Sequence, residues 1–581
     1  MKNQELAKVL YDIARYLEMD KVPFKPYAYE KVAMALESLE EGIEEIYKKG
    51  GPESLKKIPG VGEGIAKAIA EYLKTGKIRI HEEYKKKLPI DLDELVKVEG
   101  VGPKKARTLY KKLGIKNVKD LEKAAKAHKV APLFGFGEKT EKNILEGVAF
   151  LKRDKGRFLL GEIMPTAKEI IGKLSKLKEV KKISVAGSVR RMKETIGDAD
   201  ILVVSASPSK VVDFFISLPD IEKIWAKGST KASVRLKEGF DVDLRIVPEK
   251  SYGSALQYFT GSKEHNIATR IIAINKELKL NEYGVFRGPK MIAGRTEEEV
   301  YRAIGLPWIE PELRENEGEV EAALKRKLPE IIGYKDIKGD LHCHSDWDGG
   351  KNSIKEMAEY AREMGYEYIG ISDHTKFLRI ENGLNEKQLL EQRKEIEKIN
   401  RSTEALKTLS ARCSGSKFKI LQGCEANILS DGSVDIKDEV LSQLDYVIAG
   451  VHSQMKMTKS EMTERIIKAM RNPNIDIISH PTGRLLKERD EYQIDFDKIL
   501  RTAKETGTIL EINSSPERLD LKDINIRRAK EIGVKMIINT DSHEKTQMRL
   551  IEYGIAQARR GWAEKKDIIN TQSVEKLLSF F

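Results

Sequence analysis

Six of the nine histidines in this chain of 581 residues lie in its C-terminal part, each at the end of an apolar run. A glutamate and an aspartate occupy matching places. Imidazole and carboxylate groups are the ligands that divalent metal ions of hard or borderline character prefer. A single histidine of this kind would ordinarily be a satisfied core residue. Together the eight residues predict a multinuclear metal site that acts on phosphate esters. The candidate ligands are His342, His344, His374, Glu425, His452, His480, Asp541 and His543.

The apolar runs that carry these ligands alternate with stretches of helical pattern. Seven short strands are expected to end near His342, His374, Glu425, His452, His480, Asn513 and His543. Alternating strands and helices give a parallel sheet, and a closed barrel collects the carboxyl ends of its strands on one face. The sequence therefore predicts an α/β barrel of seven units, one fewer than the eight-unit type.

A second group of acidic residues lies in the middle of the chain. Asp198 and Asp200 alternate in GDADILVV, and Asp241 and Asp243 alternate in GFDVDLRIVP. Successive alternate residues of a strand project from the same face. Three carboxylates on adjacent strands can hold two Mg²⁺ ions for phosphoryl transfer. For either pair alone, a solvated strand end would be the simpler interpretation.

A short polar segment precedes the first acidic pair. It contains Gly187 and Ser188, followed by Arg190 and Arg191. Backbone N–H, hydroxyl and guanidinium groups are the donors that a triphosphate needs. The segment is therefore expected to contact the phosphates of a nucleotide.

Two similar segments near the N-terminus, LKKIPGVGEGIAKAIAEYL and LVKVEGVGPKKARTLYKKL, combine a Gly-Val-Gly turn with a basic helix. Glycine permits the tight turn and lets backbone N–H groups approach a phosphate, and the helix N-terminus adds positive potential. One such turn would usually only connect helices. Two in tandem predict helix-hairpin-helix elements that hold a DNA backbone without reading its sequence. The candidate DNA contacts are Gly60, Gly62, Gly64, Gly100, Gly102, Lys104 and Lys105.

The composition agrees with a nucleic-acid partner. The formal net charge is +12, which suits a polyanion. The sequence contains no run of about 18 apolar residues, so no membrane span is predicted. The N-terminal segment is predicted to be a folded helix rather than a targeting signal. Three cysteines without a Cys-x-x-Cys pair indicate a reducing compartment. We expect a cytoplasmic, nucleoid-associated monomer with no membrane contact.

Sequence around these motifs resembles a known family. SALQYFTGSKEHN (254–266) and LNEYGVF (280–286) resemble the nucleotide-binding and thumb segments of family X DNA polymerases such as polymerase β. FKPYAYEKVAMAL (24–36) and KIPGVG (57–62) resemble the template-gripping N-terminal domain of that family. The motifs HCH, SDH, CEANI, VHS, ISHP and TDSH resemble the PHP phosphoesterase domain. Together the chain resembles the bacterial- and archaeal-type family X polymerases that end in a PHP domain.

This resemblance implies a multidomain chain. It predicts α-helical helix-hairpin-helix domains, an α+β nucleotidyltransferase palm with a small thumb, and a C-terminal α/β PHP barrel of distorted (β/α)7 type. The expected domains are a helical template- and gap-binding domain at 1–80, fingers at 81–150, a palm at 151–250, a thumb at 251–312, a linker at 313–333 and the PHP domain at 334–581.

The resemblance also assigns roles. Asp198, Asp200 and Asp243 would hold Mg²⁺ or Mn²⁺ in the palm, because the DLRIVP context favours Asp243 over Asp241. The PHP cluster would hold two to three Mn²⁺ or Zn²⁺ ions. The partners would be gapped or primed duplex DNA and dNTPs. Tyr258 would sense a 2′-hydroxyl. The implied nucleotide-binding residues are Gly187, Ser188, Arg191, Tyr258, Phe259, Gly261, Lys263 and Asn266.

The implied activities are template-directed gap filling in DNA base excision repair and a metal-dependent 3′–5′ exonuclease, with abasic-site cleavage as an extension. Two other functions remain open. The chain could be a DNA-binding scaffold with an inactive PHP domain. Its PHP domain could instead be a phosphatase for small monoesters.

Two positions depart from the family pattern. Ala68, with Lys67 beside it, stands where relatives with deoxyribose-phosphate lyase activity carry a Schiff-base lysine, so we expect little lyase activity. Gly349 stands where an acidic PHP ligand aligns. We expect the preceding Asp348 to serve as the metal ligand instead. The alternative is that Asp348 starts a turn or caps the helix that begins near Ser353.

Overall fold

The computed structural model describes residues 2–20, 22, 25–37, 42–58, 60–96, 98, 101–152, 157–409 and 418–581. The chain divides into two compact units, Met1–Arg157 with Asn266–Ile271, and Phe158–His265 with Ile272–Phe581. Gly100, one of the predicted DNA contacts, lies outside the described residues. Within the described part of the chain, no helix is long and apolar enough to cross a membrane.

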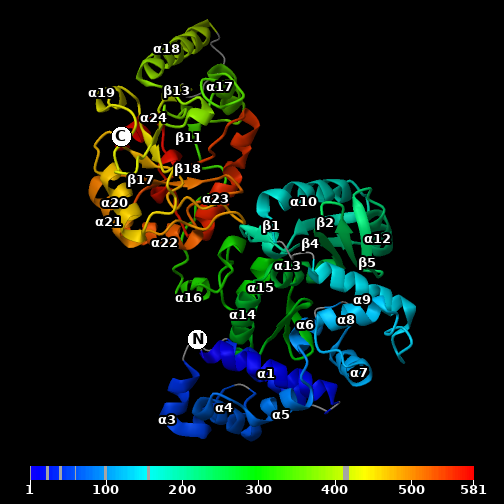
Figure 1. Ribbon diagram of the computed structural model, residues 1–581. Helices are drawn as coiled ribbons and strands as arrows, with labels where there is room; N and C mark the ends of the chain where they lie inside the picture. Colours follow the sequence, from blue (N-terminus) through cyan, green and yellow to red (C-terminus); the bar gives the residue numbers. More distant parts are fainter. Residues whose placement is uncertain are drawn as a thin grey trace. The chain divides into compact units, whose positions relative to one another are not determined.

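The N-terminal part of the first unit is helical, as the sequence predicts (Figure 1). Its helices are α1 (Lys2–Met19), α2 (Lys25–Glu37), α3 (Ile43–Leu55), α4 (Glu63–Thr75), α5 (Arg79–Lys87), α6 (Leu92–Leu95), α7 (Pro103–Leu113), α8 (Val118–Lys126) and α9 (Gly137–Lys152). They bury two separate apolar clusters, one around Leu10 and Ile69 and the other around Leu95 and Leu109. The helix that follows the first Gly-Val-Gly segment, α4, packs in the first cluster, and the helix that follows the second, α7, packs in the second cluster.

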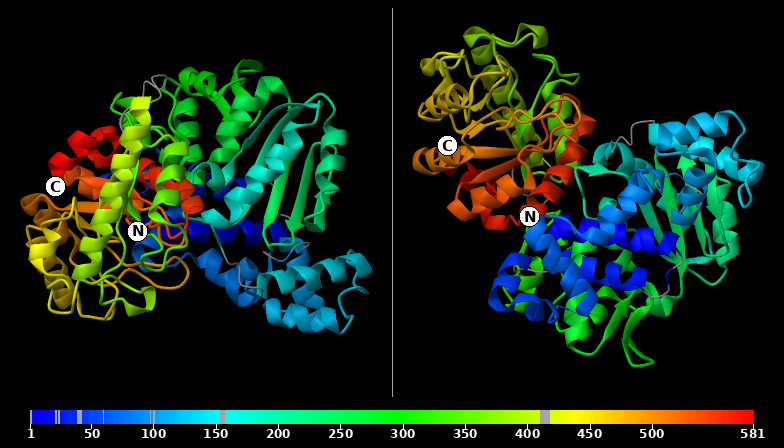
Figure 2. Two further views of the ribbon diagram at one scale, coloured as in Figure 1. Left: turned by 90° about the horizontal axis from the view of Figure 1, so that it is seen from above. Right: turned by 60° about the horizontal axis from the view of Figure 1, so that its bottom comes forward.

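The palm is a five-stranded sheet whose strands lie side by side in Figure 2. The strands are β2 (Val180–Val185), β4 (Asp198–Ser205), β5 (Ile221–Lys227), β6 (Lys231–Leu236) and β7 (Asp241–Val247), in the order β2-β4-β7-β6-β5. Strands β4 and β7 are parallel, and the other neighbouring pairs are antiparallel.

Side chains of β4 alternate between two apolar clusters, as a strand covered on both faces requires. Ile201 and Val203 pack with residues of α10 (Leu160–Ser175) and α12 (Pro208–Ile216). Leu202 packs in the other cluster, with residues of α13 (Tyr252–Thr260). The short elements beside this sheet are β1 (Phe158–Leu159), β3 (Thr195–Ile196), α11 (Gly187–Arg190) and η1 (Glu249–Ser251). Burial of both faces fixes the register that positions the aspartates.

The thumb follows α13. It comprises α14 (Lys263–Asn275), the antiparallel strands β8 (Lys279–Asn281), β9 (Gly284–Arg287) and β10 (Lys290–Ala293), and α15 (Glu297–Ala303). The expected linker contains η2 (Pro311–Leu313) and α16 (Glu319–Leu324). The side chains of Arg314 and Glu319 in this segment are completely buried. The charged segment is therefore packed as part of the fold rather than solvated along its length.

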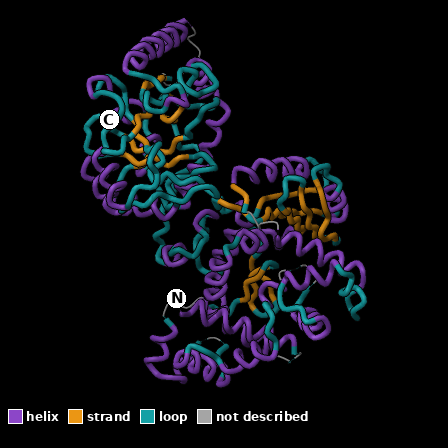
Figure 3. Tube along the Cα trace, in the orientation of Figure 1, coloured by secondary structure: helices purple, strands orange, loops and turns teal. Residues whose placement is uncertain are grey.

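The PHP domain contains only parallel strands, which Figure 3 shows at its centre with helices outside. They are β11 (Gly339–Cys343), β12 (Tyr368–Ile371), β13 (Lys419–Gln422), β14 (Glu425–Asn427), β15 (Ile448–Gly450), β16 (Ile477–Ile478), β17 (Ile509–Asn513) and β18 (Met536–Asn539). They form the sheets β11-β12-β13 and β14-β15-β16-β17-β18. The bridges His374–Glu425 and Cys343–Ser542 connect the two sheets.

Strands β13 and β14 follow each other with only Gly423 and Cys424 between them, so they occupy one of seven strand positions. The helices of this domain are α17 (Ile354–Glu363), α18 (Glu386–Leu409), α19 (Asp438–Leu441), α20 (Lys459–Met470), α21 (Phe496–Thr506), α22 (Asp523–Ile532), α23 (Ile551–Arg560) and α24 (Val574–Leu577). The predicted succession of seven parallel strands and intervening helices is confirmed. It brings all the strand ends named from the sequence to one end of the domain.

Candidate active sites: palm carboxylates and a histidine-rich metal centre

The register between β4 and β7 decides which aspartates meet in the palm. Asp198 lies opposite Asp241, and Asp200 lies opposite Asp243. Asp241 is already paired, because its carboxylate accepts hydrogen bonds from Trp225 Nε1 at 2.8 Å and from Arg235 Nη2 at 2.8 Å. This contact agrees with the expectation that Asp243, rather than Asp241, joins Asp198 and Asp200.

The carboxylate of Asp200 is half-buried, like those of Asp241 and Asp243. Burial, together with the negative charges of Asp198 and Asp243, raises the pKa of Asp200 to about 7. A divalent cation relieves such repulsion between carboxylates, so the residues fit a metal site. Gly187 has φ +62, and a Cβ atom there would lie 2.4 Å from Asp200 Oδ2. Glycine is therefore required for the backbone to pass this carboxylate.

The two arginines of the phosphate-binding segment differ in what they contact. Arg190 forms an ion pair with Glu297 at 2.6 Å and donates to the Thr260 hydroxyl at 2.6 Å. The charge of Arg190 is therefore engaged inside the fold, and its contact with a triphosphate stays a prediction. Arg191 donates through Nε to Glu315 at 2.9 Å and through Nη1 to the Thr260 carbonyl.

The remaining predicted nucleotide contacts lie around the junction of α13 and α14. The rings of Tyr258 and Phe259 pack edge to face, with centroids 5.2 Å apart. Gly261 ends α13 with φ +68, and Lys263 begins α14. Asn266 is buried within α14. Ser188 lies on α11, next to Gly187. The roles of these residues in nucleotide binding therefore stay predictions.

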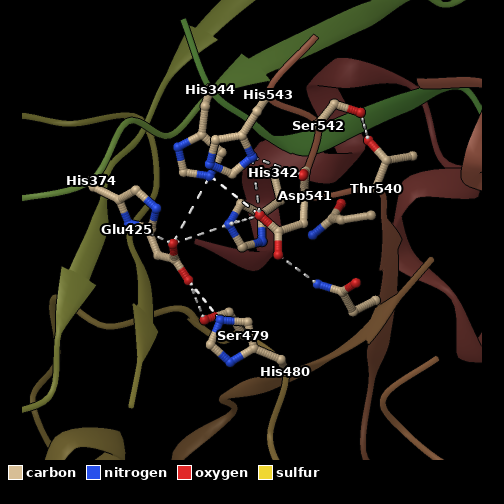
Figure 4. Close-up of polar contacts among 12 residues, drawn as sticks. His342, His344, His374, Glu425, Ser479, His480, Thr540, Asp541, Ser542 and His543 are labelled. Carbon is tan, nitrogen blue, oxygen red and sulfur yellow. Dashed lines mark hydrogen bonds and ion pairs between the residues drawn. The ribbon is translucent and has the colours of Figure 1, made fainter. Parts of the chain in front are cut away.

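The histidine-rich cluster of the PHP domain comes together at the carboxyl ends of the strands (Figure 4). Four overlapping groups have ligand atoms within 4.8 Å of one another. They are His342 with His344 and Asp541, His374 with Glu425 and His452, His344 with His374 and His543, and His344 with Asp348 and Asp373. The Nε2 atom of His480 lies 3.0 Å from Glu425 Oε1. All eight residues predicted from the strand ends therefore belong to one site.

Several atoms of this cluster are buried without a hydrogen-bond partner. Among the described residues they are His480 Nδ1, His342 Nε2, His344 Nε2, His374 Nδ1 and Glu425 Oε2. The last two are 2.9 Å apart, and His342 Nε2 is 3.3 Å from the same oxygen, yet neither pair is aligned as a hydrogen bond. Unpaired buried polar atoms are rare, so their convergence fits a shared cation. The donor set is one that Mn²⁺ and Zn²⁺ accept.

A layer of acceptors behind the cluster orients the histidine rings. Glu511 Oε1 lies 2.7 Å from His342 Nδ1, and Asn427 Oδ1 lies 2.8 Å from His452 Nδ1. An acceptor at Nδ1 places the ring proton there and leaves Nε2 for the metal. Sequence reasoning missed Glu511. The signal was a glutamate inside the apolar strand TILEIN, where an unpaired carboxylate would be costly.

The charges of the cluster are strongly coupled. Burial alone would lower the pKa of His342, but the carboxylates of Glu511, Glu425 and Asp541 raise it well above its usual range. Burial likewise opposes ionisation of Glu425, and the imidazoles of His342, His452 and His374 nevertheless hold its pKa well below its usual range. The carboxylates therefore stay ionised and favour positive charge at the cluster, from protons or from a metal ion.

Comparison with known proteins agrees with both sites. The chain matches four protein families: a helix-hairpin-helix domain over 1–78, a SAM-like helix-hairpin-helix tandem over 92–149, the DNA polymerase beta thumb over 255–315 and the PHP domain over 340–515. It is 37% identical over 585 residues to the DNA polymerase/3′-5′ exonuclease PolX of Bacillus subtilis (strain 168). That alignment covers 100% of this chain and 99% of the relative. The chain belongs to the PolX family.

The PHP part of this PolX-family chain has other relatives as well. It is 31% identical over 176 residues to a probable phosphatase of Thermoanaerobacter sp. (strain X514), covering 29% of this chain and 69% of that protein. A probable phosphatase of Caldicellulosiruptor saccharolyticus is 29% identical over 222 residues, covering 36% of this chain and 82% of that protein.

Asp348 lies behind the cluster of this PolX-family chain. Its Oδ2 atom lies 2.7 Å from His344 Nδ1 and accepts the His374 backbone N–H at 2.8 Å. Its Oδ1 atom accepts the Gly350 N–H at 2.9 Å, so it also stabilises a turn. The alternative that it caps α17 is wrong, because the hydroxyl of Ser353 does so. The contact supports an orienting role for Asp348, and its predicted role as a ligand stays a prediction.

The carboxylate of Glu381 occupies the space that a side chain at position 349 would need. A Cβ atom built on Gly349 would lie 2.2 Å from Glu381 Oε2. Glu381 comes from the short helix η3 (Arg379–Glu381), which follows His374 in the chain. Sequence reasoning missed this approach, since nothing local to Glu381 indicates it.

The helix-hairpin-helix turns lie at equivalent places in the first unit. Helix α4 begins directly after Gly62, and helix α7 begins directly after Gly102. Lys104 lies in the first turn of α7, next to Lys105, whose Nζ atom is 5.3 Å from the centre of the Phe136 ring. Both turns therefore precede a helix as predicted. Gly60 has φ +89, and no side chain of another residue comes within 4 Å of a Cβ built on Gly64.

The lyase position departs from the family as expected. Ala68 is buried in α4, and the side chain of the neighbouring Lys67 is 73% exposed. Lys67 Nζ forms an ion pair with Glu63 at 2.8 Å. This exposed, ion-paired lysine differs from the desolvated lysine that Schiff-base chemistry uses.

Proposed function

We propose that the chain is a DNA repair polymerase that fills gaps by template-directed nucleotide addition and removes nucleotides with its PHP domain as a 3′–5′ exonuclease. The observation that carries this proposal is the convergence of eight candidate metal-ligand side chains in a PolX-family chain. Among the described residues, five atoms of these side chains are buried without a hydrogen-bond partner. The three palm carboxylates supply the second centre. We infer that the chain works as a monomer, in the cytoplasm at the nucleoid.

In the palm, Asp198, Asp200 and Asp243 would hold Mg²⁺ or Mn²⁺. Two such ions would acidify the primer 3′-hydroxyl and neutralise the pyrophosphate that leaves. Asp200 contributes best after it loses its proton, which its pKa of about 7 delays to neutral pH. The helix-hairpin-helix turns at Gly62 and Gly102 would hold the backbone of gapped or primed duplex DNA, while Tyr258 and Phe259 would contact the incoming dNTP.

In the PHP domain, the eight clustered residues would hold Mn²⁺ or Zn²⁺. Ions in such a cluster supply hydroxide at neutral pH and stabilise charge on the phosphate. Glu511, Asp348 and Asn427 keep the imidazole rings in the orientation that this binding needs.

Arg518 is available to the substrate phosphate. Its Nε atom lies 3.6 Å from Asp541 Oδ2, and its side chain is 22% exposed. Among the described residues, its guanidinium donates no hydrogen bond and has no other carboxylate within ion-pair distance. A guanidinium in this setting suits a non-bridging oxygen of a phosphodiester.

A protein nucleophile is not needed and is not well placed. Cys343 and Cys424 are completely buried next to the cluster. Burial raises the pKa of both thiols well above their usual range, so neither is a reactive thiolate. The scaffold alternative, with an inactive PHP domain, is disfavoured by the nearly full set of clustered candidate ligands.

A phosphatase for small monoesters is the second candidate for the PHP domain. Its similarity to two probable phosphatases favours this reading. The two reactions differ in their products, because an exonuclease releases mononucleotides from DNA and a phosphatase releases inorganic phosphate from a monoester. Both products can be measured with the same preparation.

One end-labelled gapped duplex tests both proposed activities, with and without dNTPs, in Mg²⁺ and then in Mn²⁺. Asp243→Asn should abolish extension and retain degradation, because a two-metal site loses one ligand. Asp241→Asn is the matched control, since Asp241 faces Trp225 and Arg235 instead. His344→Asn should abolish degradation and retain extension. Loss of both activities in a folded single variant would refute the two-site proposal.

A further inference from the structure

The side chain of Arg191 is fixed on two of its three guanidinium nitrogens. Nε donates to Glu315 at 2.9 Å, and Nη1 donates to the carbonyl of Thr260. The side chain is only 13% exposed. Within the part of the chain that the structure describes, Nη2 donates no hydrogen bond. The nitrogen that remains for a ligand is therefore held in a defined direction.

The partner of Arg191 is itself held by the PHP domain. Arg560, the last residue of α23, lies 3.1 Å through Nη1 from Glu315 Oε1. The same nitrogen donates to the backbone carbonyl of Arg191 at 3.2 Å. Its Nη2 atom bonds to the carboxylate of Asp523, the first residue of α22, and the side chain of Arg560 is 2% exposed. One buried arginine of the nuclease domain thus contacts both the backbone and the ion-pair partner of Arg191.

We propose that Arg560 and Glu315 form a clamp that positions Arg191 for the triphosphate of the incoming nucleotide. The nuclease domain would then contribute to nucleotide binding at the polymerase site. The inference rests on the proposed polymerase function, in which Arg191 contacts the triphosphate. An arginine that is already ordered loses less conformational freedom when the nucleotide binds, so the clamp lowers the cost of binding.

The opposite role, in which Glu315 occupies the place of the phosphate and inhibits, fits the contacts less well. Glu315 engages Nε and leaves Nη2 open. Lys193 also lies 3.7 Å from Glu315, so three cations share this single carboxylate and the surroundings of Arg191 stay attractive to an anion.

Single-nucleotide addition by the full chain tests the clamp. We expect Glu315→Gln and Arg560→Lys to raise KM for the dNTP about three- to tenfold, the cost of ordering one long side chain. The value of kcat should change less, and exonuclease activity of the same preparations should stay unchanged. Glu298→Gln is the matched control, because it removes the same charge from an exposed side chain of α15.

A double-mutant cycle separates positioning from general destabilisation. In an Arg191→Ala chain, Glu315→Gln should have no further effect on KM, because the positioned group is absent. A lower KM in Glu315→Gln would show that Glu315 inhibits, and an unchanged KM or an additive cycle would show that the clamp does not act on the nucleotide. Each of these results overturns the inference. A wild-type chain that adds no nucleotide would instead refute the proposed polymerase function.

Discussion

Glu511 offers a direct test of how the outer layer supports the metal cluster, through the isosteric change Glu511→Gln. Its Oε1 atom pairs with His342 Nδ1 at 2.7 Å and accepts from Asn539 Nδ2 at 3.1 Å. Its Oε2 atom accepts from the His480 backbone N–H at 2.8 Å and from Asn513 Nδ2 at 3.2 Å. All four neighbours are donors, and all are buried. A glutamine amide must therefore direct its own NH₂ group at one pair of them.

The size of the effect follows from these contacts. The variant loses at least two accepted hydrogen bonds and the carboxylate charge that keeps His342 oriented. Loss of such an outer-layer partner typically costs about 10- to 100-fold in metal affinity, which equals about 1.4–2.7 kcal/mol. The exonuclease should therefore need correspondingly more Mn²⁺ for half-maximal rate, while nucleotide addition by the palm stays normal.

The assay is a Mn²⁺ titration of 3′-end degradation, with nucleotide addition measured in the same preparation as the control for folding. Glu505→Gln is the matched control variant, because it replaces the same carboxylate by an amide on an exposed face of α21. An unchanged Mn²⁺ requirement in a folded Glu511→Gln chain would refute the reasoning. Loss of nucleotide addition as well would show that Glu511 supports the fold rather than the metal.

Three further outcomes are expected. Asp348→Asn should lower Mn²⁺ affinity or exonuclease rate about tenfold. The midpoint of thermal unfolding in the presence of a chelator should not change. Full activity of the variant at limiting Mn²⁺ would show that Asp348 only stabilises its turn. Borohydride trapping on an incised abasic site should be weak, because Ala68 replaces the expected lysine and Lys67 is paired with Glu63; strong trapping that Lys67→Ala removes would contradict this. Burial would raise the pKa of Glu297, but Arg314 and Arg190 lower it from 4.5 to about 2. Its carboxylate therefore stabilises the fold above about pH 4.5, and about 3 kcal/mol is lost as the pH falls to about 2. Wild type should lose this stability in acid unfolding and Glu297→Gln should not; equal losses would refute the pairing.

Local periodicity determined much of this protein from its sequence. A histidine that closes an apolar run lies at the end of a strand, and parallel strands end on one face. That rule alone brought together residues as distant in sequence as His342 and His543. The alternation of Asp198 with Asp200 likewise placed both on one face of β4, because side chains of a strand alternate.

Long-range packing decided what the sequence left open. Strand alternation places Asp241 and Asp243 on the same face and does not show which of them is available to a metal ion. The neighbouring strand β6 makes the difference, because its Arg235 donates a hydrogen bond to Asp241. Arg190 and Arg191 are adjacent, yet Glu297 takes the first and Glu315 the second.

Two of the orienting contacts are equally remote in sequence. Glu511 lies 169 residues from His342, and Arg560 lies 369 residues from Arg191. Periodicity specifies which face a side chain occupies, because that depends on a few neighbouring backbone angles. The residue that a side chain contacts depends on how elements distant in the sequence pack together. A short sequence pattern does not contain that information. The sequence therefore predicted the residues that come together at both centres, and only the tertiary structure showed most of the groups that orient them.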